Sequence, residues 1–366
     1  MTFSVENQNH RRFMARALEL ARRGLYTATP NPRVGCVIVR DGAVVGEGWH
    51  ERAGEAHAEV HALRMAGERA RGATVYVTLE PCAHQGRTAP CCAALIAAGV
   101  SRVIAAMQDP NPLVAGKGFA LLRAASVAVE SGLMAHEAGE LNIGFASRMT
   151  RARPWVRVKV AASLDGRTAL LNGQSQWITG ADARRDGHAW RAQACAILTG
   201  IGTVKDDNPR LTVRDVETTR QPLRVVVDSR LETPPDAQVV GAGTMIAAAA
   251  NHAQRAQALQ ACGAEIIVLP SAAGKVELSD LMLELGRRGI NELHVEAGYK
   301  LNGSLLNEGL VDELLVYLAP CLLGDAARGM FHLPELKALS GRRALNIVDV
   351  RQIGPDIRIL ARVAPV

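Results

Sequence analysis

The sequence predicts an α/β protein with two domains, and three observations indicate this fold class. Apolar runs typical of strands alternate with helical patterns along the chain, as in an α/β sandwich. The length of 366 residues is sufficient for two hydrophobic cores. At residues 147–154 (SRMTRARP), basic residues and a proline interrupt the alternation. Because this stretch is short and poor in Gly and Ser, we expect a junction between closely packed domains, at residues 1–150 and 151–366.

The first domain begins with a helical pattern, in which Phe13, Ala17, Leu20 and Ala21 form an apolar stripe. Two strands should follow at residues 34–39 and 43–49, joined by a turn at Asp41-Gly42. The remaining pattern predicts a helix over residues 57–70, a buried strand over 73–79, a helix over 91–98 and a strand over 100–107.

The second domain resumes the alternation. Apolar runs predict strands at residues 155–163, 194–200, 223–229, 265–269, 292–298 and 313–320, with helices between them. Residues 214–222 and 231–243 are rich in Pro, Thr, Asp and Gly and should be surface loops.

Composition and charge favour an enzyme with small-molecule ligands. Apolar residues make up 48% and charged residues 21% of the chain, as in ordinary globular proteins. The net charge of +6 forms no basic tract, and aromatic residues, at 4%, are too few for a platform that stacks nucleic-acid bases. A mildly basic enzyme for phosphorylated small molecules accounts for this balance. We therefore expect no nucleic-acid partner, while a homo-oligomer is compatible with the sequence.

The sequence also predicts a cytoplasmic protein without membrane contacts. The first residues, MTFSVENQNHRRF, lack the basic segment and apolar block of a secretory signal, and no apolar run is long enough to span a membrane. The 7 cysteines are an odd number at irregular positions, which is poor material for a disulfide framework. In a reducing compartment their thiols would be available to bind a metal.

His57, Cys82 and Cys91 are the strongest candidates for metal ligands. One imidazole and two thiolates can hold a zinc ion and leave its fourth tetrahedral position open for water. Cys91 falls at the start of a predicted helix, where the helix dipole favours a thiolate over a thiol. Glu59, two residues after the histidine, is not needed as a ligand and is free to move protons. This combination is typical of the zinc deaminases, which convert an aminopyrimidine or aminopurine to the oxo form.

The expected chemistry gives each group a role. Two thiolates compensate the charge of the ion, and water at the open position can lose a proton and attack an amidine-like carbon. Glu59 would take that proton and deliver it to the ring nitrogen and to the departing ammonia. Such a role contributes about 10²–10⁴-fold in rate.

A structural zinc site is the alternative, and it would need a fourth protein ligand. Cys92 follows Cys91 directly in a helix, so its side chain points about 100° away, and we expect it to be a small buried hydrophobic residue. His84, in the loop between the two cysteine ligands, is the better rival for the fourth position.

Segments of the first domain resemble the deaminase half of the RibD family of bacterial bifunctional riboflavin-biosynthesis proteins. They are TATPNPRVGCVIVRDGAVVGEGWH, GEAHAEVHALR, YVTLEPCAHQGRTAPCC and MQDPNPLVAGKGF, and the similarity extends over residues 10–150. General nucleoside and tRNA deaminases usually have Cys-x-x-Cys, whereas eight residues separate Cys82 from Cys91, as in this family. The resemblance implies a cytidine-deaminase-like α/β/α sandwich. It further implies that Asn31 holds the pyrimidine, and that Asp109 and Asn111, within residues 109–118, help to seat substrate and phosphate.

The second domain lacks a complete Gly-x-Gly-x-x-Gly motif, and Gly200-Ile201-Gly202 after a predicted strand is only a partial match. Gly298 follows another predicted strand, and Gly303-Ser304 lies at an expected helix start. A turn of this kind offers backbone N–H groups to a phosphate, and an ordinary strand-to-helix turn is the alternative.

Segments of this domain resemble the reductase half of the same family. They are WVRVKVAASLDGRTA, SQWITG, ILTGIGTVKDDNPRLTVR, VVVDS and HVEAGYKLNGSLLNEGLVDELLVYLAP, within residues 154–366. The resemblance implies a dihydrofolate-reductase-like α/β domain that uses NADPH. It implies that the ribosyl-phosphate substrate is held by Ser175, Arg191, Leu211, Arg214 and Glu296. The residues implied for the cofactor are Ala161, Trp177, Thr203, Asp207, Ser229, Gly298, Tyr299, Lys300, Leu301, Asn302, Gly303 and Ser304.

Several of these roles also have a physical reason. Arg191 and Arg214 suit a phosphate monoester because guanidinium groups bind it bidentately. Arg230 is placed to meet the 2′-phosphate of NADPH, with a surface role as the alternative. Lys159 and Asp207 are candidates for moving protons when the sugar ring opens. In the alternative, Lys159 neutralises the substrate phosphate and Asp207 hydrogen-bonds the nicotinamide amide.

The resemblance as a whole implies a bifunctional hydrolase and oxidoreductase of riboflavin biosynthesis, with Zn²⁺ and NADPH as cofactors. It would deaminate 2,5-diamino-6-ribosylamino-4(3H)-pyrimidinone 5′-phosphate and then reduce the ribosyl group to ribityl. A nucleic-acid base deaminase with an appended domain is one rival, and the spacing of Cys82 and Cys91 and the scarcity of aromatic residues count against it. A zinc-containing nucleotide-binding regulator without turnover is another, although it would have no use for Glu59 beside an open metal position.

Overall fold

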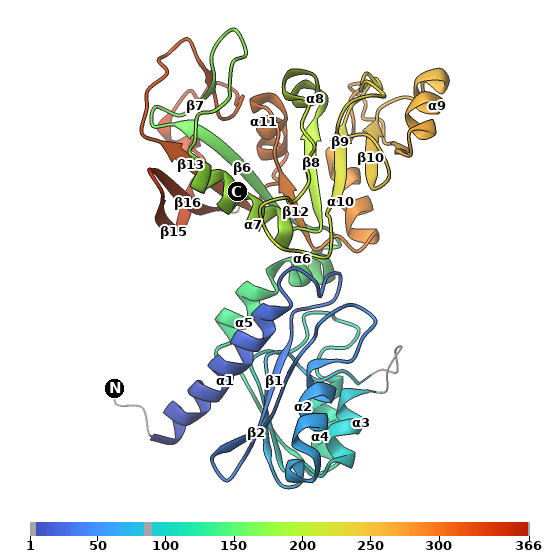
Figure 1. Cartoon of the computed structure of the whole chain (residues 1–366), viewed down its shortest axis with the longest axis vertical. Helices are drawn as coiled ribbons and strands as arrows, with labels where there is room; N and C mark the ends of the chain where they lie inside the picture. Colours follow the sequence, from blue (N-terminus) through green and yellow to red (C-terminus); the bar gives the residue numbers. More distant parts are fainter. Residues whose placement is uncertain (1–4, 84–89, 365–366) are drawn as a thin grey trace. The chain divides into compact units, whose positions relative to one another are not determined.

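The structure is a computed structural model that describes residues 5–83 and 90–364. The chain divides into two compact units, Met1–Ala152 and Arg153–Val366, and each contains its own sheet with helices on both faces (Figure 1). Within the described part of the chain, no helix is both long and apolar enough to cross a membrane.

The first unit is an α/β/α sandwich around a five-stranded sheet with the strand order β2-β1-β3-β4-β5. β1 is antiparallel to β2 and β3, whereas β3, β4 and β5 run parallel. The elements are α1 (Val5–Arg23), β1 (Gly35–Arg40), β2 (Ala43–Trp49), α2 (Ala58–Ala66), the 3₁₀ turn η1 (Gly67–Ala70), β3 (Thr74–Val77), α3 (Cys91–Ala97), β4 (Arg102–Ala105), α4 (Lys117–Ala124), β5 (Ala128–Ser131), α5 (Ala135–Leu141) and α6 (Ile143–Arg151).

The alternation of side chains along β1 builds both layers of this unit. Cys36 and Ile38 belong to a core shared with α2, α3 and α4, whereas Val37 and Val39 belong to one shared with α1. Figure 1 shows α1 and α5 on one side of the sheet and α2, α3 and α4 on the other. Both faces of the sheet are therefore covered, as in the predicted sandwich.

A glycine on β2 allows α2 to pack very closely on the sheet. A Cβ atom on Gly48 would lie 2.4 Å from the carbonyl oxygen of Ala58, so no larger residue fits there without a shift of the backbone. Because Ala58 is the first residue of α2, this contact places the start of the helix, with His57 and Glu59, against the end of β2.

The second unit is built on a nine-stranded sheet with the order β11-β10-β9-β8-β12-β6-β13-β16-β15. Neighbouring strands from β11 to β13 are parallel, and β16 and β15 are added antiparallel at one edge. The elements are β6 (Trp155–Ser163), β7 (Arg167–Ala169), α7 (Ala181–Gln193), β8 (Ala196–Gly200), α8 (Ile201–Asp207), β9 (Leu223–Val227), β10 (Thr244–Ala248), α9 (Ala253–Ala261), β11 (Glu265–Val268), α10 (Leu278–Arg287), β12 (Glu292–Val295), α11 (Tyr299–Asn307), β13 (Glu313–Ala319), β14 (Arg328–Gly329), the 3₁₀ turn η2 (Leu339–Gly341), β15 (Leu345–Ile353) and β16 (Asp356–Val363).

Helices cover both faces of the sheet in this unit as well. Val158 and Val160 on β6 belong to the core that contains α10 and α11. Lys159 lies between them in the sequence and so points to the opposite face, where its ammonium group is 5.9 Å from the ring centre of Tyr317. Parallel strands β8 and β12 end beside each other, so the residues that follow them, including Thr203 and Glu296, meet at one edge of the sheet.

The mixed α/β class and both halves of the fold prediction are confirmed, but the sequence reading missed several strands. β10, β15 and β16 were not expected. The β15 segment is exposed along most of its length and so lacks the apolar run of a buried strand. The β10 segment TMIAA is fully buried, but it is rich in alanine and carries no strand-specific pattern.

The interruption at residues 147–154 is shorter than the sequence suggested. Residues up to Arg151 continue α6, and the helix ends at Ala152, which adopts a left-handed conformation with φ of 56°. Basic side chains in the last turn interact favourably with the helix dipole, so Arg148 and Arg151 stabilise the end of α6 and do not interrupt it.

Candidate functional site

Three side chains of the first unit converge as expected for metal ligands. His57 is the N-cap of α2, Cys91 is the first residue of α3, and Cys82 lies in the loop after β3. The Nδ1 atom of His57 is 3.2 Å from Sγ of Cys91 and 3.6 Å from Sγ of Cys82, and all three donor atoms lie within 4.8 Å of one another. Ligands at about 2.0 Å (nitrogen) and 2.3 Å (sulfur) from a tetrahedral zinc ion are separated by about 3.5 Å. The donor set therefore fits zinc in both chemistry and spacing.

The electrostatics of the thiols also suit a cation. Hydrogen bonds with Cys91 and His57 lower the pKa of Cys82 to about 4, so Cys82 is a thiolate at neutral pH. The backbone N–H of Cys91 donates to the same sulfur at 3.3 Å. The pKa of Cys91 is raised, first by its hydrogen bond with Cys82 and then by burial. A dication between the two sulfurs would compensate both charges.

Glu59 stands beside these ligands as a buried carboxyl group without a full set of partners. Its exposed fraction is 3%, and its Oε2 atom has no hydrogen-bond partner. Burial, followed by the charge of Cys82, raises the pKa of Glu59 above its usual value. Buried polar groups are normally hydrogen-bonded, so an orphaned carboxylate oxygen next to a metal site indicates a group that handles protons or ligand.

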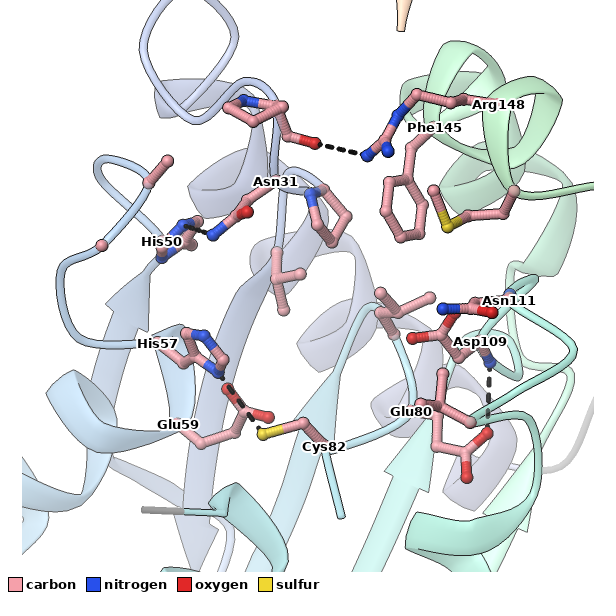
Figure 2. Close-up of a pocket in the computed structure, with 18 of the residues that line it drawn as sticks. Asn31, His50, His57, Glu59, Glu80, Cys82, Asp109, Asn111, Phe145 and Arg148 are labelled. Carbon is pink, nitrogen blue, oxygen red and sulfur yellow. Dashed lines mark hydrogen bonds between the residues drawn. The ribbon is translucent and has the colours of Figure 1, made fainter. Parts of the chain in front are cut away.

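These residues open into a cavity of about 600 Å³ within the first unit. Figure 2 shows His57, Glu59 and Cys82 at one side of it, with Asn31 and His50 above them. The Nδ2 atom of Asn31 is 3.0 Å from Nε2 of His50, whose Nδ1 is 3.1 Å from the carbonyl oxygen of Ala56. Because a carbonyl only accepts, Nδ1 carries a proton, and His50 is suited to hold the amide of Asn31.

The opposite wall carries the other predicted substrate residues. Asp109 and Asn111 line the cavity, and the carboxylate of Asp109 accepts the backbone N–H of Asn111 at 2.8 Å. The ring of Phe145 and the guanidinium of Arg148, both from α6, face the same space (Figure 2). The structure thus brings Asn31, Asp109 and Asn111 to the cavity that holds Glu59.

Sequence reasoning missed several residues of this wall. His50, on the side of the cavity that carries Asn31, ends the segment GEGWH and gave no signal beyond its residue type. Phe145 and Arg148 gave none, because they lie on a helix far along the chain from the zinc motif. Glu80, two residues before Cys82, also lines the cavity, but the spacing of the metal ligands gives no signal for it.

The rival fourth ligands have different outcomes. Cys92 is buried, and its Sγ lies 3.2 Å from the carbonyl oxygen of Pro81, away from the cluster of three donors. His84 falls outside the described residues.

In the second unit two adjoining cavities, of about 530 and 210 Å³, share a set of polar side chains. The shared residues are Lys159, Thr203, Asp207 and Glu296. The larger cavity also reaches the predicted residues Trp177, Arg191, Leu211 and Arg214, and the smaller reaches Ala161, Ser175, Gly298, Tyr299 and Asn302. Four of the five predicted substrate residues therefore gather at the larger cavity, and half of the predicted cofactor residues line the smaller one.

Glu296 and Arg191 form a part-buried ion pair between these cavities. The Nε and Nη2 atoms of Arg191 donate to the two carboxylate oxygens of Glu296 at 2.5 and 2.8 Å. The nearby Arg191 holds the pKa of Glu296 well below its usual range despite burial. Since this pair occupies the guanidinium fork, Arg214, which is exposed, is the better placed of the two predicted arginines for a phosphate.

Lys159 and Asp207 differ in their surroundings. Burial lowers the pKa of Lys159, opposed by the charge of Glu296 and reinforced by that of Arg191. Asp207 is exposed at the end of α8, where the hydroxyl of Ser175 donates to it at 3.2 Å. Both side chains line both cavities, so the structure brings the pair to one place.

The glycine-rich turn differs from the expectation in one respect. Gly298 is the N-cap of α11, as a phosphate-binding turn requires, but Gly303 and Ser304 lie inside that helix and not at its start. A Cβ atom on Gly303 would lie 2.1 Å from the carbonyl oxygen of His332, so this glycine serves close packing. Gly303 and Ser304, like Ser229, Lys300 and Leu301, do not line either cavity.

Asn302 supplies a further feature of the smaller cavity. Its exposed fraction is 2%, its Nδ2 donates to the carbonyl oxygen of Ala297 at 3.1 Å, and its Oδ1 has no partner. An unpaired buried acceptor fits a ligand that carries N–H donors, as the carboxamide of nicotinamide does. A helix N-terminus and an unpaired acceptor on one cavity wall are thus compatible with a nicotinamide dinucleotide.

His188 is a residue of the larger cavity that sequence reasoning did not identify. It is buried on α7, and its Nδ1 accepts the backbone N–H of Arg214 at 3.3 Å. A lone histidine within a helical pattern gives no signal of this kind, because its partner lies in a loop that only the fold brings near.

Comparisons with known proteins identify the family of both halves of the chain. The model of the RibD C-terminal domain matches residues 154–359, and that of the cytidine and deoxycytidylate deaminase zinc-binding region matches residues 7–107. The riboflavin biosynthesis protein RibD of Escherichia coli K12 is 51% identical over 360 residues, which cover 94% of this chain and 97% of the relative. The corresponding protein of Haemophilus influenzae is 47% identical, with 95% of each chain covered.

Solved structures give the same result. Acinetobacter baumannii RibD (form 1) superposes with a TM-score of 0.91 at 43% identity, covering 98% of this chain and 100% of that one. A diaminohydroxyphosphoribosylaminopyrimidine deaminase/5-amino-6-(5-phosphoribosylamino)uracil reductase from Thermotoga maritima has a TM-score of 0.87 at 30% identity, with the same coverage.

Proposed function

Because the chain belongs to the RibD family of bifunctional riboflavin-biosynthesis proteins, we propose that its two candidate sites perform the two reactions of that family with the residues described above. The chain is a zinc-dependent deaminase and an NADPH-dependent reductase. It deaminates 2,5-diamino-6-ribosylamino-4(3H)-pyrimidinone 5′-phosphate and then reduces the ribosyl side chain to ribityl. We assign the first step to residues 1–150 and the second to residues 151–366.

In the deaminase site, His57, Cys82 and Cys91 hold the metal. One zinc ion on these ligands supplies a Lewis acid for the attacking water. Glu59 takes a proton from that water and passes it to the ring nitrogen and to the leaving ammonia, a role supported by its burial and its unpartnered oxygen.

Asn31, Asp109 and Asn111 orient the pyrimidine in the same cavity. The contact with Nε2 of His50 directs the amide N–H of Asn31 away from the ligand, so the carbonyl oxygen of that amide is left to accept from a ring N–H or an amino group. The carboxylate of Asp109 accepts similar donors.

In the reductase site, the cofactor binds along Ala161, Thr203 and the turn at Gly298, and the ribosyl phosphate binds beside Arg214. NADPH supplies the hydride, and the protein positions the sugar carbon against it. Lys159 and Asp207 move the protons that open the ribosylamine ring, one onto the ring oxygen and one off the exocyclic nitrogen. The lowered pKa of Lys159, caused by burial, supports this role because it makes the ammonium group a stronger acid than an ordinary lysine.

The remaining assignments follow the sequence. The substrates are small molecules, and we propose that the protein acts in the cytoplasm without a nucleic-acid or membrane partner. In support, none of the 7 cysteines forms a disulfide, as is usual in a reducing compartment.

One observation carries this proposal: three donor atoms lie at separations that suit zinc, beside a buried carboxyl group with an unpartnered oxygen. The test is to incubate the zinc-loaded protein with the diaminopyrimidine ribosyl phosphate, with and without NADPH. We expect ammonia in both cases and NADPH oxidation only after ammonia release. Supplying the deaminated intermediate should give NADPH oxidation without ammonia. Absence of ammonia from zinc-loaded protein would contradict the deaminase assignment.

A further inference from the structure

Glu80 is a buried carboxylate in the deaminase unit that the chemistry described so far does not use. Its exposed fraction is 5%, and its two oxygens accept four backbone N–H groups. Oε2 accepts from Asp109 at 3.1 Å and from Gly116 at 2.9 Å, and Oε1 accepts from Gly118 at 2.9 Å and from Phe119 at 3.2 Å. Four amides on one carboxylate form a closely matched anion site, filled here by the protein's own side chain.

The position of Glu80 in the chain joins two parts of the active site. Its own backbone N–H donates to the carbonyl oxygen of Met107 at 3.0 Å, and Cys82, a metal ligand, follows two residues later. The four amides belong to the segment 109–119, which begins with the two substrate residues of the far wall. Figure 2 shows Glu80 beneath Asp109 and Asn111, with its hydrogen bond to the Asp109 backbone.

The two parts are also packed tightly against each other. A Cβ atom on Gly118 would lie 2.1 Å from the carbonyl oxygen of Pro81, so the segment closes on the residue between Glu80 and Cys82. The thiol of Cys92 lies 3.2 Å from that same carbonyl and 3.5 Å from the carbonyl of Gly118. A shift of the segment would therefore change its distance from the metal ligands directly.

We propose that Glu80 is a positioning residue for the deamination, because it holds segment 109–119 at a set distance from Cys82. Asp109 and Asn111 then contact the pyrimidine while the amino-bearing carbon of the pyrimidine faces the metal. This inference rests on the proposed deaminase function of the cavity. Glu80 acts through the backbone of the segment and moves no proton. Its loss should therefore weaken substrate binding more than the chemical step.

The test compares Glu80→Gln with the unaltered full-length protein. Glutamine keeps the length of the side chain, but its NH₂ group turns a donor toward two of the four backbone donors. We expect zinc content near one ion per chain and unchanged reduction of supplied deaminated intermediate. The kcat/KM of deamination should fall on the order of 10–10²-fold, mostly through KM, because a misplacement of about 1 Å in a binding group costs up to about 10²-fold.

A matched control is available in the other unit. Asp165 is also a carboxylate that accepts backbone N–H groups across a loop, those of Leu323 and Gly324. Asp165→Asn makes the same chemical change without touching the deaminase cavity, and ammonia release should stay at the level of the unaltered protein.

A double-variant cycle separates positioning from simple loss of structure. If Glu80 acts through the segment, Glu80→Gln should raise KM by much less in the Asn111→Ala variant than in the unaltered protein. Should Glu80→Gln fail to fold, Glu80→Asp keeps the charge but is too short to reach all four amides, and an intermediate rise in KM is expected.

Three outcomes would overturn the proposal: zinc loss in Glu80→Gln, an unchanged KM, or full additivity with Asn111→Ala. Failure of the unaltered, zinc-loaded protein to release ammonia would instead reject the proposed function, so the two failures are distinguishable.

Discussion

The two candidate sites differ in how far apart in the sequence their residues lie. The three proposed metal ligands and Glu59 come from residues 57–91, and two of these ligands lie at the starts of α2 and α3. The reductase cavities instead combine β6, α7, α8, the turn after β12 and a residue as distant as Met330. A chemical centre made from nearby residues can be recognised by spacing, whereas one made at the edge of a parallel sheet depends on topology.

The sites also differ in how they compensate buried charge. In the deaminase unit, Glu80 is held by four backbone amides, and Glu59 is left with an unpartnered oxygen. In the reductase unit, Glu296 is paired bidentately with Arg191. Buried charge in the first site is therefore compensated by backbone N–H groups and a metal, and in the second by side-chain ion pairs. The two should therefore respond separately to substitution.

The largest expected effect is the loss of the metal from one site alone. Cys82→Ser or Cys91→Ser should remove zinc and abolish deamination, because loss of an outer-shell partner already costs about 10–100-fold and loss of a ligand costs more. Reduction of supplied deaminated intermediate should persist. Metal analysis and the two activity assays check this.

Cys92→Ser is the matched control, since Cys92 is buried next to the ligand Cys91 but lies outside the donor cluster. Its zinc content should match that of the unaltered protein. Equal zinc loss in the Cys92 variant would refute the ligand assignment.

Within the deaminase site, Glu59→Gln should keep the metal and lose the chemistry. We expect a decrease of about 10²–10⁴-fold in kcat for ammonia release, the range for a general acid or base. Zinc content and NADPH oxidation with supplied intermediate should be unchanged. A zinc-free Glu59→Gln protein would show that Glu59 helps to hold the metal, contrary to the proposed roles.

For the reductase site, Lys159→Met and Asp207→Asn should slow the hydride-transfer step in single-turnover experiments by on the order of 10²-fold. Affinity for NADPH should stay within a few-fold, and ammonia release should not change. Lys337→Met, a change at an exposed lysine of the same unit, serves as the control. Weakened ligand binding with an intact chemical step would instead identify Lys159 and Asp207 as binding groups.

The pH dependence of the same step sharpens this test. If Lys159 donates a proton, the rate is highest while the ammonium form is present and falls as the pH rises through its pKa. Because burial lowers that pKa, the fall should begin below the value of about 10.4 for an ordinary lysine. Single-turnover rates against pH should show this limb in the unaltered protein and not in Lys159→Met.

The smallest expected effect concerns cofactor choice. NADPH should be preferred to NADH. If Arg230 meets the 2′-phosphate, Arg230→Ala should reduce this preference by roughly tenfold, which is the lower end of the range for losing a hydrogen bond to a charged group. Arg230 now forms an ion pair with Glu232 at 2.8 Å and its side chain is 74% exposed, so little is lost when it changes partner. Equal kcat/KM with both cofactors in the unaltered protein would reject the preference.

Elements whose pattern of apolar residues lies within one short stretch of sequence could be predicted. The period of the apolar residues predicted β1, β2, β6 and the helix starts at His57 and Cys91 to within one or two residues. The reason is that these elements are buried on a regular face, so their composition records their burial. Exposed β15 carries no such record, whereas β10 is buried but contains Met and Ala, which favour helices.

Residue types and their spacing predicted the α/β class and a candidate ligand set with its neighbouring carboxylate, and the family resemblance predicted the reactions. Three contacts depend on the tertiary structure: the pairing of Arg191 with Glu296, the packing of Gly303 against a backbone carbonyl, and the hydrogen bonds by which Glu80 holds the segment of the substrate wall. These contacts link residues far apart in the chain, and their strength depends on distances of a few tenths of an ångström. Residue type and spacing encode which groups are present, but the packing of helices on the sheets sets which of them touch.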